Sequence, residues 1–187
     1  MGSSIAYDLR YLEAALDLLE DFIKSPEIYW SLSVSPPPGE PPYPQLSLGN
    51  VLLALQRLQR PLEKGEEAAL REAHADALDR IRQRYRAVWE QKAVKEARMR
   101  ARLWAQYIAE LAKEPSSKAY YAAEVRNRAI LELLRQEATL PDTIETLRAH
   151  ADRRLQSRFE PGEFIWDEDL APAFPSQTFW YLYGQPR

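Results

Sequence analysis

The sequence of 187 residues contains no cysteine. Without thiols the chain can form no disulfide, no thiolate zinc site and no iron–sulfur centre, and it has no cysteine nucleophile. Glycine is also scarce, with six residues, and none forms the glycine-rich loop that cradles phosphates in P-loop and dinucleotide-binding folds. The Gly-x-Ser-x-Gly pattern of serine hydrolases is missing too. These absences exclude the common nucleotide-binding folds and give nucleophilic catalysis no support.

An excess of charge of one sign and long apolar runs are missing as well. The chain has 25 Lys and Arg against 28 Asp and Glu, and a net charge of −3 does not indicate a nucleic-acid or membrane partner for the whole molecule. The longest apolar runs cover a few residues, whereas a membrane span needs roughly 20. Residues 1–7 show no cationic region followed by an apolar stretch, so we expect no secretory leader and a cytoplasmic location.

The residues that are present favour an all-α fold. Hydrophobic residues make up 45% of the chain and charged residues 28%, which is typical of a globular protein. Apolar side chains recur every three or four positions, the spacing of one helix face. The length fits a single domain, 1–187, and we expect an irregular bundle of about five helices. Four of these helices are predicted at residues 7–24, 47–59, 117–138 and 141–159.

The remaining predicted helix is the longest segment of the chain. Residues 66–114 contain no glycine or proline and consist mainly of strong helix formers, while Gly65 and Pro115 bound the segment. As one straight helix these 49 residues would extend about 73 Å. A compact domain of this length is only about 40 Å across. The sequence therefore predicts one very long central helix that either outgrows its domain or bends.

The apolar face of this helix narrows in its middle. Ala93, Ala97 and Ala101 lie at steps of four and leave room for another helix to approach closely, and large residues flank them on both sides. We interpret this stretch as a helix crossing point or a dimer contact. The predicted interaction seam consists of Tyr85, Trp89, Ala93, Ala97, Ala101 and Trp104.

Two further segments stand out by composition. Residues 25–46 hold seven of the fourteen prolines and form a proline-rich connector, expected to be extended. Its P-x-x-P spacings are also those that SH3-like domains bind, but we favour a rigid spacer packed against Trp30 and the aromatic tail. That tail, 160–187, is irregular and proline-containing, and with Phe159 it carries eight of the twenty aromatic residues. We expect it to wrap the helices as a strap held by its rings.

Histidines and acidic pairs are the candidates for a metal site. Each of the two histidines lies two positions before an aspartate, so the pair points to different helix faces. Asp76 and Asp79 have the i,i+3 spacing with which helical bundles hold metals, as do Asp142 and Glu145. The second pair also fits a capping box that begins a helix. We predict no metal site and no cofactor, and a metal-dependent hydrolase is kept as an alternative.

A basic segment, 80–102, raises the possibility of nucleic-acid binding. Between Asp79 and Arg102 the chain has nine Lys or Arg and three Asp or Glu, and two aromatic residues lie among them. Such a segment could bind phosphates or RNA. However, steps of two spread Arg80 to Arg86 around the helix, and acidic segments elsewhere could pair with it. Nucleic-acid binding is therefore a second alternative that we do not favour.

The leading hypothesis is a non-enzymatic interaction or structural protein that self-associates through the long helix as a homodimer. A helix that extends beyond its domain needs a second copy, or another protein partner, to cover its apolar face. The alternative is a small-molecule-binding helical bundle or enzyme whose pocket combines tail aromatics with polar residues of the helices. Its candidate ligand-binding residues are Tyr120, Tyr121, Arg126 and Arg128. No catalytic residue is assigned.

Overall fold

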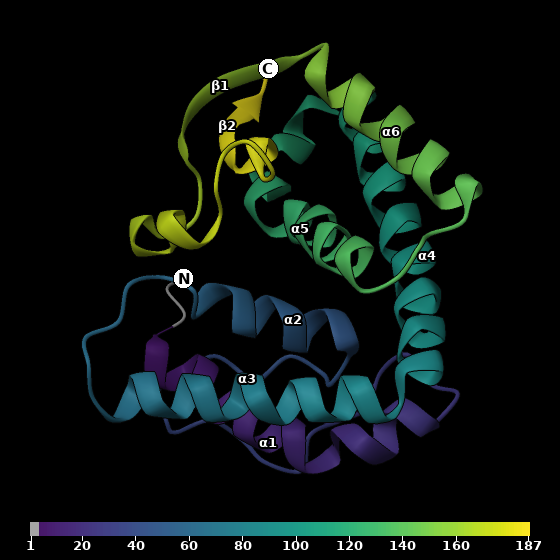
Figure 1. Cartoon of the computed structure of the whole chain (residues 1–187). Helices are drawn as coiled ribbons and strands as arrows, with labels where there is room; N and C mark the ends of the chain where they lie inside the picture. Colours follow the sequence, from purple (N-terminus) through teal and green to yellow (C-terminus); the bar gives the residue numbers. More distant parts are fainter. Residues whose placement is uncertain (1–3) are drawn as a thin grey trace.

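The computed structural model describes residues 4–187 of the chain. Helices make up most of it, as the sequence predicts, and a small two-stranded sheet lies near the C-terminus (Figure 1). The α-helices are α1 (Ile5–Lys24), α2 (Leu48–Arg57), α3 (Glu66–Arg84), α4 (Arg86–Leu111), α5 (Tyr121–Glu137) and α6 (Asp142–Gln156). The strands are β1 (Phe159–Phe164) and β2 (Tyr183–Pro186), and the 3-10 turns are η1 (Pro115–Tyr120), η2 (Glu168–Ala173) and η3 (Trp180–Leu182).

Serine side chains begin the first two helices. The hydroxyl of Ser4 accepts the backbone N–H of Tyr7 at 3.0 Å. In the same way the hydroxyl of Ser47 accepts the N–H of Asn50 at 3.1 Å. Each bond satisfies one of the amide donors that a helix leaves unpaired at its start. Helix α1 stops just before Pro26, because a proline disfavours helical conformation in the residue that precedes it.

The prediction of one unbroken helix over 66–114 is wrong. The backbone leaves the helical conformation at Tyr85, where φ is −115° and ψ is 31°. Helix α3 ends at Arg84 and α4 begins at Arg86, and the two helices run in sharply different directions (Figure 1). Of the two outcomes that the length of this segment allows, the chain therefore takes the bend.

No glycine or proline lies at this bend, so the local sequence does not explain it. Contacts with other helices hold it instead. The carboxylate of Glu137, at the end of α5, pairs with Arg82 of α3 through two bonds of 2.7 and 2.8 Å. The same carboxylate accepts the indole N–H of Trp89 of α4 at 2.8 Å. The Tyr85 hydroxyl donates to Glu20 of α1. One acidic side chain thus holds both sides of the bend, and α1 holds its corner.

Helix α4 is the spine of the upper half of the molecule in Figure 1 and packs against α5 and α6. Helix α1 packs against α3 and α2, and α2 reaches across to α5. Gly49 permits the close approach of α2, because a Cβ at this position would collide with the Ile130 side chain and lie 2.6 Å from Glu96 Oε1. Helix α2 therefore joins the lower helices to the upper ones.

The tail folds back on the helices, and its two short strands are joined by a long connection that contains η2 and η3. Strands β1 and β2 are antiparallel, with Phe159 opposite Pro186. The side chains of Phe174, Phe179 and Tyr181 are buried. Aromatic rings at these positions hold the irregular segment against the helical body.

The connector 25–46 lies along α1. The backbone of Trp30 pairs with that of Leu46 through bonds of 3.0 and 2.8 Å. The Tyr43 ring packs 5.0 Å from the ring of Tyr7 in α1. The first contact joins the two ends of the connector to each other, and the second joins the connector to α1. Within residues 4–187, no helix combines the length and apolarity that crossing a membrane requires.

Candidate functional site

The predicted interaction seam is buried inside this chain. Trp89 is 1% exposed, and the other seam residues of α4 are fully buried, where α5 and α6 pack on the helix. Tyr85 lies at the bend and is half-buried. The face that was expected to need a second copy is therefore covered by the chain's own helices. Self-association stays a prediction, without the exposed seam that motivated it.

The four candidate ligand-binding residues do not come together. Tyr120 is 66% exposed. Tyr121 is in the core, and its hydroxyl donates to the Tyr181 carbonyl at 2.7 Å. Arg126 and Arg128 both belong to α5, but two positions apart on a helix they face different directions. The two arginine side chains therefore lie in different polar regions of the molecule.

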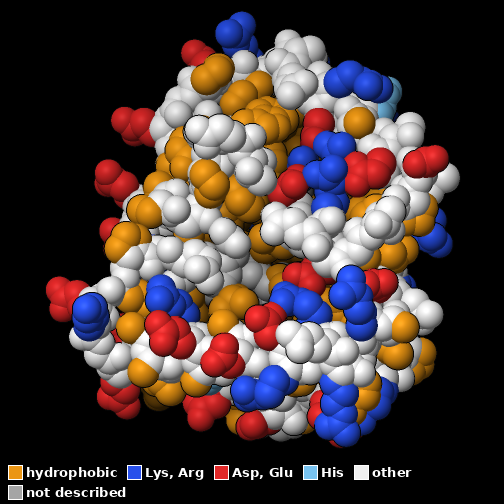
Figure 2. Space-filling view, in the orientation of Figure 1, with side chains coloured by type: hydrophobic (Ala, Val, Ile, Leu, Met, Phe, Trp, Pro, Cys, Tyr) orange, Lys and Arg blue, Asp and Glu red, His pale blue; other side chains and the backbone are white. Residues whose placement is uncertain are grey.

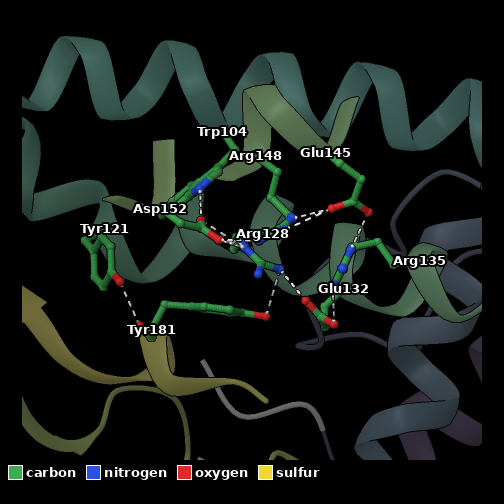
Figure 3. A network of polar contacts seen from close by, with 9 residues as sticks. All are labelled: Trp104, Tyr121, Arg128, Glu132, Arg135, Glu145, Arg148, Asp152 and Tyr181. Carbon is green, nitrogen blue, oxygen red and sulfur yellow. Dashed lines mark hydrogen bonds and ion pairs between the residues drawn. The ribbon is translucent and has the colours of Figure 1, made fainter. Parts of the chain in front are cut away.

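Arg128 belongs to a closed ring of six charged side chains, which we call the ionic ring (Figure 3). Helices α5 and α6 each supply three of its members, and positive and negative groups alternate around it. Every adjacent pair is joined by an ion pair of 2.7–3.1 Å. In order, the ring consists of Asp152, Arg128, Glu132, Arg135, Glu145 and Arg148.

The ionic ring is balanced in charge and saturated with hydrogen bonds. Three arginines face three carboxylates, and the Trp104 indole N–H adds a bond of 3.0 Å to Asp152. The Arg128 guanidinium also lies 4.6 Å from the centre of the Tyr181 ring. Burial lowers the pKa of Arg128, but Tyr181, Asp152 and Glu132 outweigh burial and raise it. Among residues 4–187, the buried side-chain nitrogen and oxygen atoms without a partner include none from this ring.

The position of these side chains indicates a structural role for the ring. It connects α5 to α6, and through Trp104 and Tyr181 it connects both helices to α4 and to the tail (Figure 3). A balanced and satisfied network offers a ligand neither excess charge nor a spare buried donor. The charge of Arg128 is therefore balanced inside the chain, and its predicted role in ligand binding stays a prediction.

Arg126 faces a cavity of about 670 Å³, which we call the arginine cavity. The cavity lies between the C-terminal end of α2, the first turns of α5 and the tail segment that leads into η2. The Trp166 indole N–H donates to the Ala122 carbonyl at 2.8 Å and so fixes the tail to α5. Gln56 of α2 donates to the carbonyl of Ala173 in η2. The lining residues are Arg57, Ala122, Ala123, Arg126, Ile165, Trp166, Asp167 and Leu170.

The Arg126 guanidinium has no carboxylate partner among the described residues. One terminal nitrogen, Nη2, donates to the Asn50 amide oxygen at 3.0 Å, and the buried Nε has no partner. Burial, followed by the like charges of Arg57 and Arg100, lowers the pKa of Arg126 to about 10. The group remains positively charged at neutral pH.

The two neighbouring arginines, Arg100 and Arg57, each have a carboxylate within reach. Arg100 pairs at 2.9 Å with Glu96, which also accepts the Gly49 N–H. Arg57 reaches Asp8 at 3.5 Å, a long contact, and its buried Nε has no partner within the described chain. Three arginines thus share two carboxylates. Arg126 is the one of the three that has no carboxylate in contact.

Comparison of the chain with known protein families, with curated proteins and with solved structures finds no match. The candidate site therefore rests on its own geometry.

Sequence reasoning named Arg126 but missed Arg57 and Trp166 as site residues. Arg57 is one of many arginines and occupies an ordinary position at a helix end, so no local signal separates it from the others. Trp166 is one of the tail aromatics expected to line a pocket, but the sequence does not single it out among them. Only the fold brings α2, α5 and the tail to one cavity.

The acidic pairs that suggested a metal take other roles. Among the described residues, no group of three or more His, Asp or Glu is placed to hold a metal ion. Helix α6 begins at Asp142 without a side-chain cap, so the predicted capping box is wrong. Glu145, its expected partner, belongs to the ionic ring instead.

Several basic residues of the segment 80–102 take part in internal contacts. Arg82 pairs with Glu137, Arg86 with Glu90, and Arg100 with Glu96. The Lys92 ammonium is enclosed by backbone carbonyls at 2.6–2.8 Å just beyond the end of α1. On the face drawn in Figure 2, acidic and basic side chains alternate over the lower helices without forming a field of one sign. Nothing in this arrangement favours a nucleic-acid interface.

Proposed function

We propose that this chain is a small-molecule-binding helical protein whose ligand is an organic anion held in the arginine cavity. The observation that carries the proposal is the Arg126 guanidinium, a half-buried charge whose buried Nε has no partner and which has no carboxylate in contact. Moving an ion out of water costs several kcal/mol unless a counter-charge compensates it. An anion in the cavity would supply that counter-charge.

The size and lining of the cavity suit this ligand. Its volume of about 670 Å³ falls within the range of sites that hold small molecules. Ile165, Trp166 and Leu170 offer apolar surface for the body of a ligand, opposite two arginines that would bind its charge. Among the described lining residues there is no serine, histidine or lysine, and Asp167 is the single acid. The lining therefore supports binding and gives no basis for a catalytic step.

Isothermal titration with two simple anions that share a phenyl ring, 3-phenylpropionate and phenyl phosphate, tests the proposal. We expect at least one of them to bind the wild type in the millimolar range or tighter, and Arg126→Met to abolish that binding. The matched control is Arg98→Met, which removes an exposed arginine of α4 outside the cavity and should bind like the wild type. Absence of binding by both anions, or equal binding by Arg126→Met, would refute the proposal.

Self-association, the first expectation from the sequence, is kept as a prediction for sedimentation equilibrium. No surface is assigned to it, because the helices of this chain bury the seam on α4.

A further inference from the structure

The charges around the arginine cavity distinguish one class of anion from another. Arg57 and Arg126 contribute two positive charges to the lining, and Asp167 contributes one negative charge. Behind the lining, Arg100 is matched by Glu96, and Asp8 lies 3.5 Å from Arg57, so lining and backing together hold three positive and three negative charges. The lining itself carries one positive charge in excess, and Arg126 has no carboxylate in contact. A ligand with a single negative charge would balance the lining, whereas a dianion would place surplus negative charge beside Asp167.

The hydrogen-bond donors that Arg57 and Arg126 leave free also suit a ligand with a single negative charge. Arg126 uses Nη2 for Asn50, and Arg57 uses Nη1 for Asp8. The opposite terminal nitrogens, Nη1 of Arg126 and Nη2 of Arg57, have no hydrogen-bond partner in the described chain, and neither is among its buried unpaired atoms. Each arginine thus offers one accessible nitrogen. Two such donors equal in number the two oxygens of a carboxylate.

The apolar wall of the cavity is held in place before any ligand arrives. The Trp166 indole is fixed by its bond to the Ala122 carbonyl and by edge-on contacts with two rings. These are Phe164, at 6.3 Å, and Phe174, at 5.3 Å. A fixed indole in the lining is a ready surface for a flat ring, and aromatic pairs of this kind add about 0.5–1.5 kcal/mol beyond area burial. Little ordering of the protein is then needed on binding.

From these three observations, we infer that the ligand is a monoanionic carboxylic acid with an aromatic body. Its carboxylate lies between Arg57 and Arg126, and its ring lies against Trp166. Asp167 selects against a second negative charge. This inference rests on the proposed function and adds the chemical class of the ligand and the residue that sets its charge.

The charge of the probe provides the test. At about pH 8 phenyl phosphate is mainly a dianion, whereas near pH 5 it is mainly a monoanion, because its second pKa is about 6. We expect 3-phenylpropionate to bind the wild type at least about tenfold more tightly than phenyl phosphate at pH 8. The affinity for phenyl phosphate should rise as the pH is lowered to 5. Propionate, which lacks the ring, and 3-phenylpropanamide, which lacks the charge, should both bind more weakly than 3-phenylpropionate.

Asp167→Asn supplies the matched variant. The amide keeps the size of the side chain, and the Asp167 carbonyl that accepts the Leu170 N–H is unchanged, so the turn at η2 should persist. Circular dichroism checks the fold. In this variant phenyl phosphate at pH 8 should bind about as well as 3-phenylpropionate.

The possible results separate the two proposals. If phenyl phosphate at pH 8 binds the wild type more tightly than the carboxylate, and this binding needs Arg126, the assigned ligand class is wrong but the anion site stands. If Asp167→Asn leaves the preference unchanged, the selective role of Asp167 is wrong. If neither probe binds, both the site and the ligand class are refuted.

Discussion

Two arginines of α5, two positions apart, occupy opposite electrostatic environments. Arg128 faces α6 and contacts two carboxylates of the ionic ring, and its pKa is raised. Arg126 faces α2 and the tail, contacts one neutral amide oxygen, and has its pKa lowered to about 10 by burial and like charges. Arg128 is buried and Arg126 is half-buried. Only Arg128 has carboxylates of the chain in contact with its charge.

This difference separates a structural charge from a candidate binding charge. A buried ion pair with all its hydrogen bonds made holds elements together and has nothing left for a ligand. A buried charge without a counter-ion reduces stability unless something else supplies that ion. Strongly perturbed groups that line a cavity are therefore candidates for function. The two arginines form an internal comparison that mutation can test.

The largest effect is expected from Arg128→Met. The substitution keeps most of the side-chain volume but leaves Asp152 and Glu132 buried with fewer partners. Breaking one member of a buried ion pair costs about 3–5 kcal/mol. We expect a loss of this size in the free energy of unfolding, measured by urea denaturation at neutral pH. The exposed Arg154→Met is the control and should stay within about 0.5 kcal/mol of the wild type. A similarly small change for Arg128→Met would show that the ring does not stabilise the fold.

Acid should weaken the ionic ring through Glu145. Burial alone would raise the pKa of this carboxyl, but hydrogen bonds from Arg135 and Arg148 outweigh burial and hold it below its ordinary value. A carboxyl with a depressed pKa stabilises the fold above its unfolded pKa, about 4.3, and this contribution is lost as the pH falls through the folded value. Glu145→Gln should therefore cost about 1 kcal/mol near neutral pH, since Glu145 is partly exposed.

The difference between Glu145→Gln and the wild type should then shrink below about pH 4, where the wild-type carboxyl becomes protonated. Urea denaturation over a series of pH values measures it. A difference that stays constant down to about pH 3 would mean that the charge of Glu145 is not what the ring uses.

The fold class could be predicted from the sequence, but the bend between α3 and α4 could not. Helix-forming residues without glycine or proline favour a continuous helix at Tyr85 as much as elsewhere. The bend is fixed by Glu20 and Glu137, which approach from other helices. Local propensity contains no information about such contacts. The inference of an exposed seam failed with the straight helix from which it was drawn.

In the ionic ring, too, some contacts could be predicted from the sequence and others could not. Four of its links are visible in the sequence as i,i+4 or i,i+3 pairs, for example Arg128 with Glu132 and Arg148 with Asp152. The links that close the ring join α5 to α6 and depend on how the helices pack, as Arg135 with Glu145 does. The arginine cavity is harder still to predict, because its charged and aromatic residues come from three separate segments.

The smallest change in stability is expected from Arg126→Met. The substitution removes one hydrogen bond, to Asn50, worth about 1 kcal/mol, but it also removes a buried charge that no carboxylate compensates. These effects oppose each other, so the free energy of unfolding should stay within about 1 kcal/mol of the wild type, measured as for Arg128→Met. With 3-phenylpropionate at about 100 times its Kd, the wild type should gain about 2.7 kcal/mol and the variant nothing. If Arg126→Met instead lost as much as Arg128→Met, the chain would already compensate the charge of Arg126, and the case for a bound anion would lose its basis.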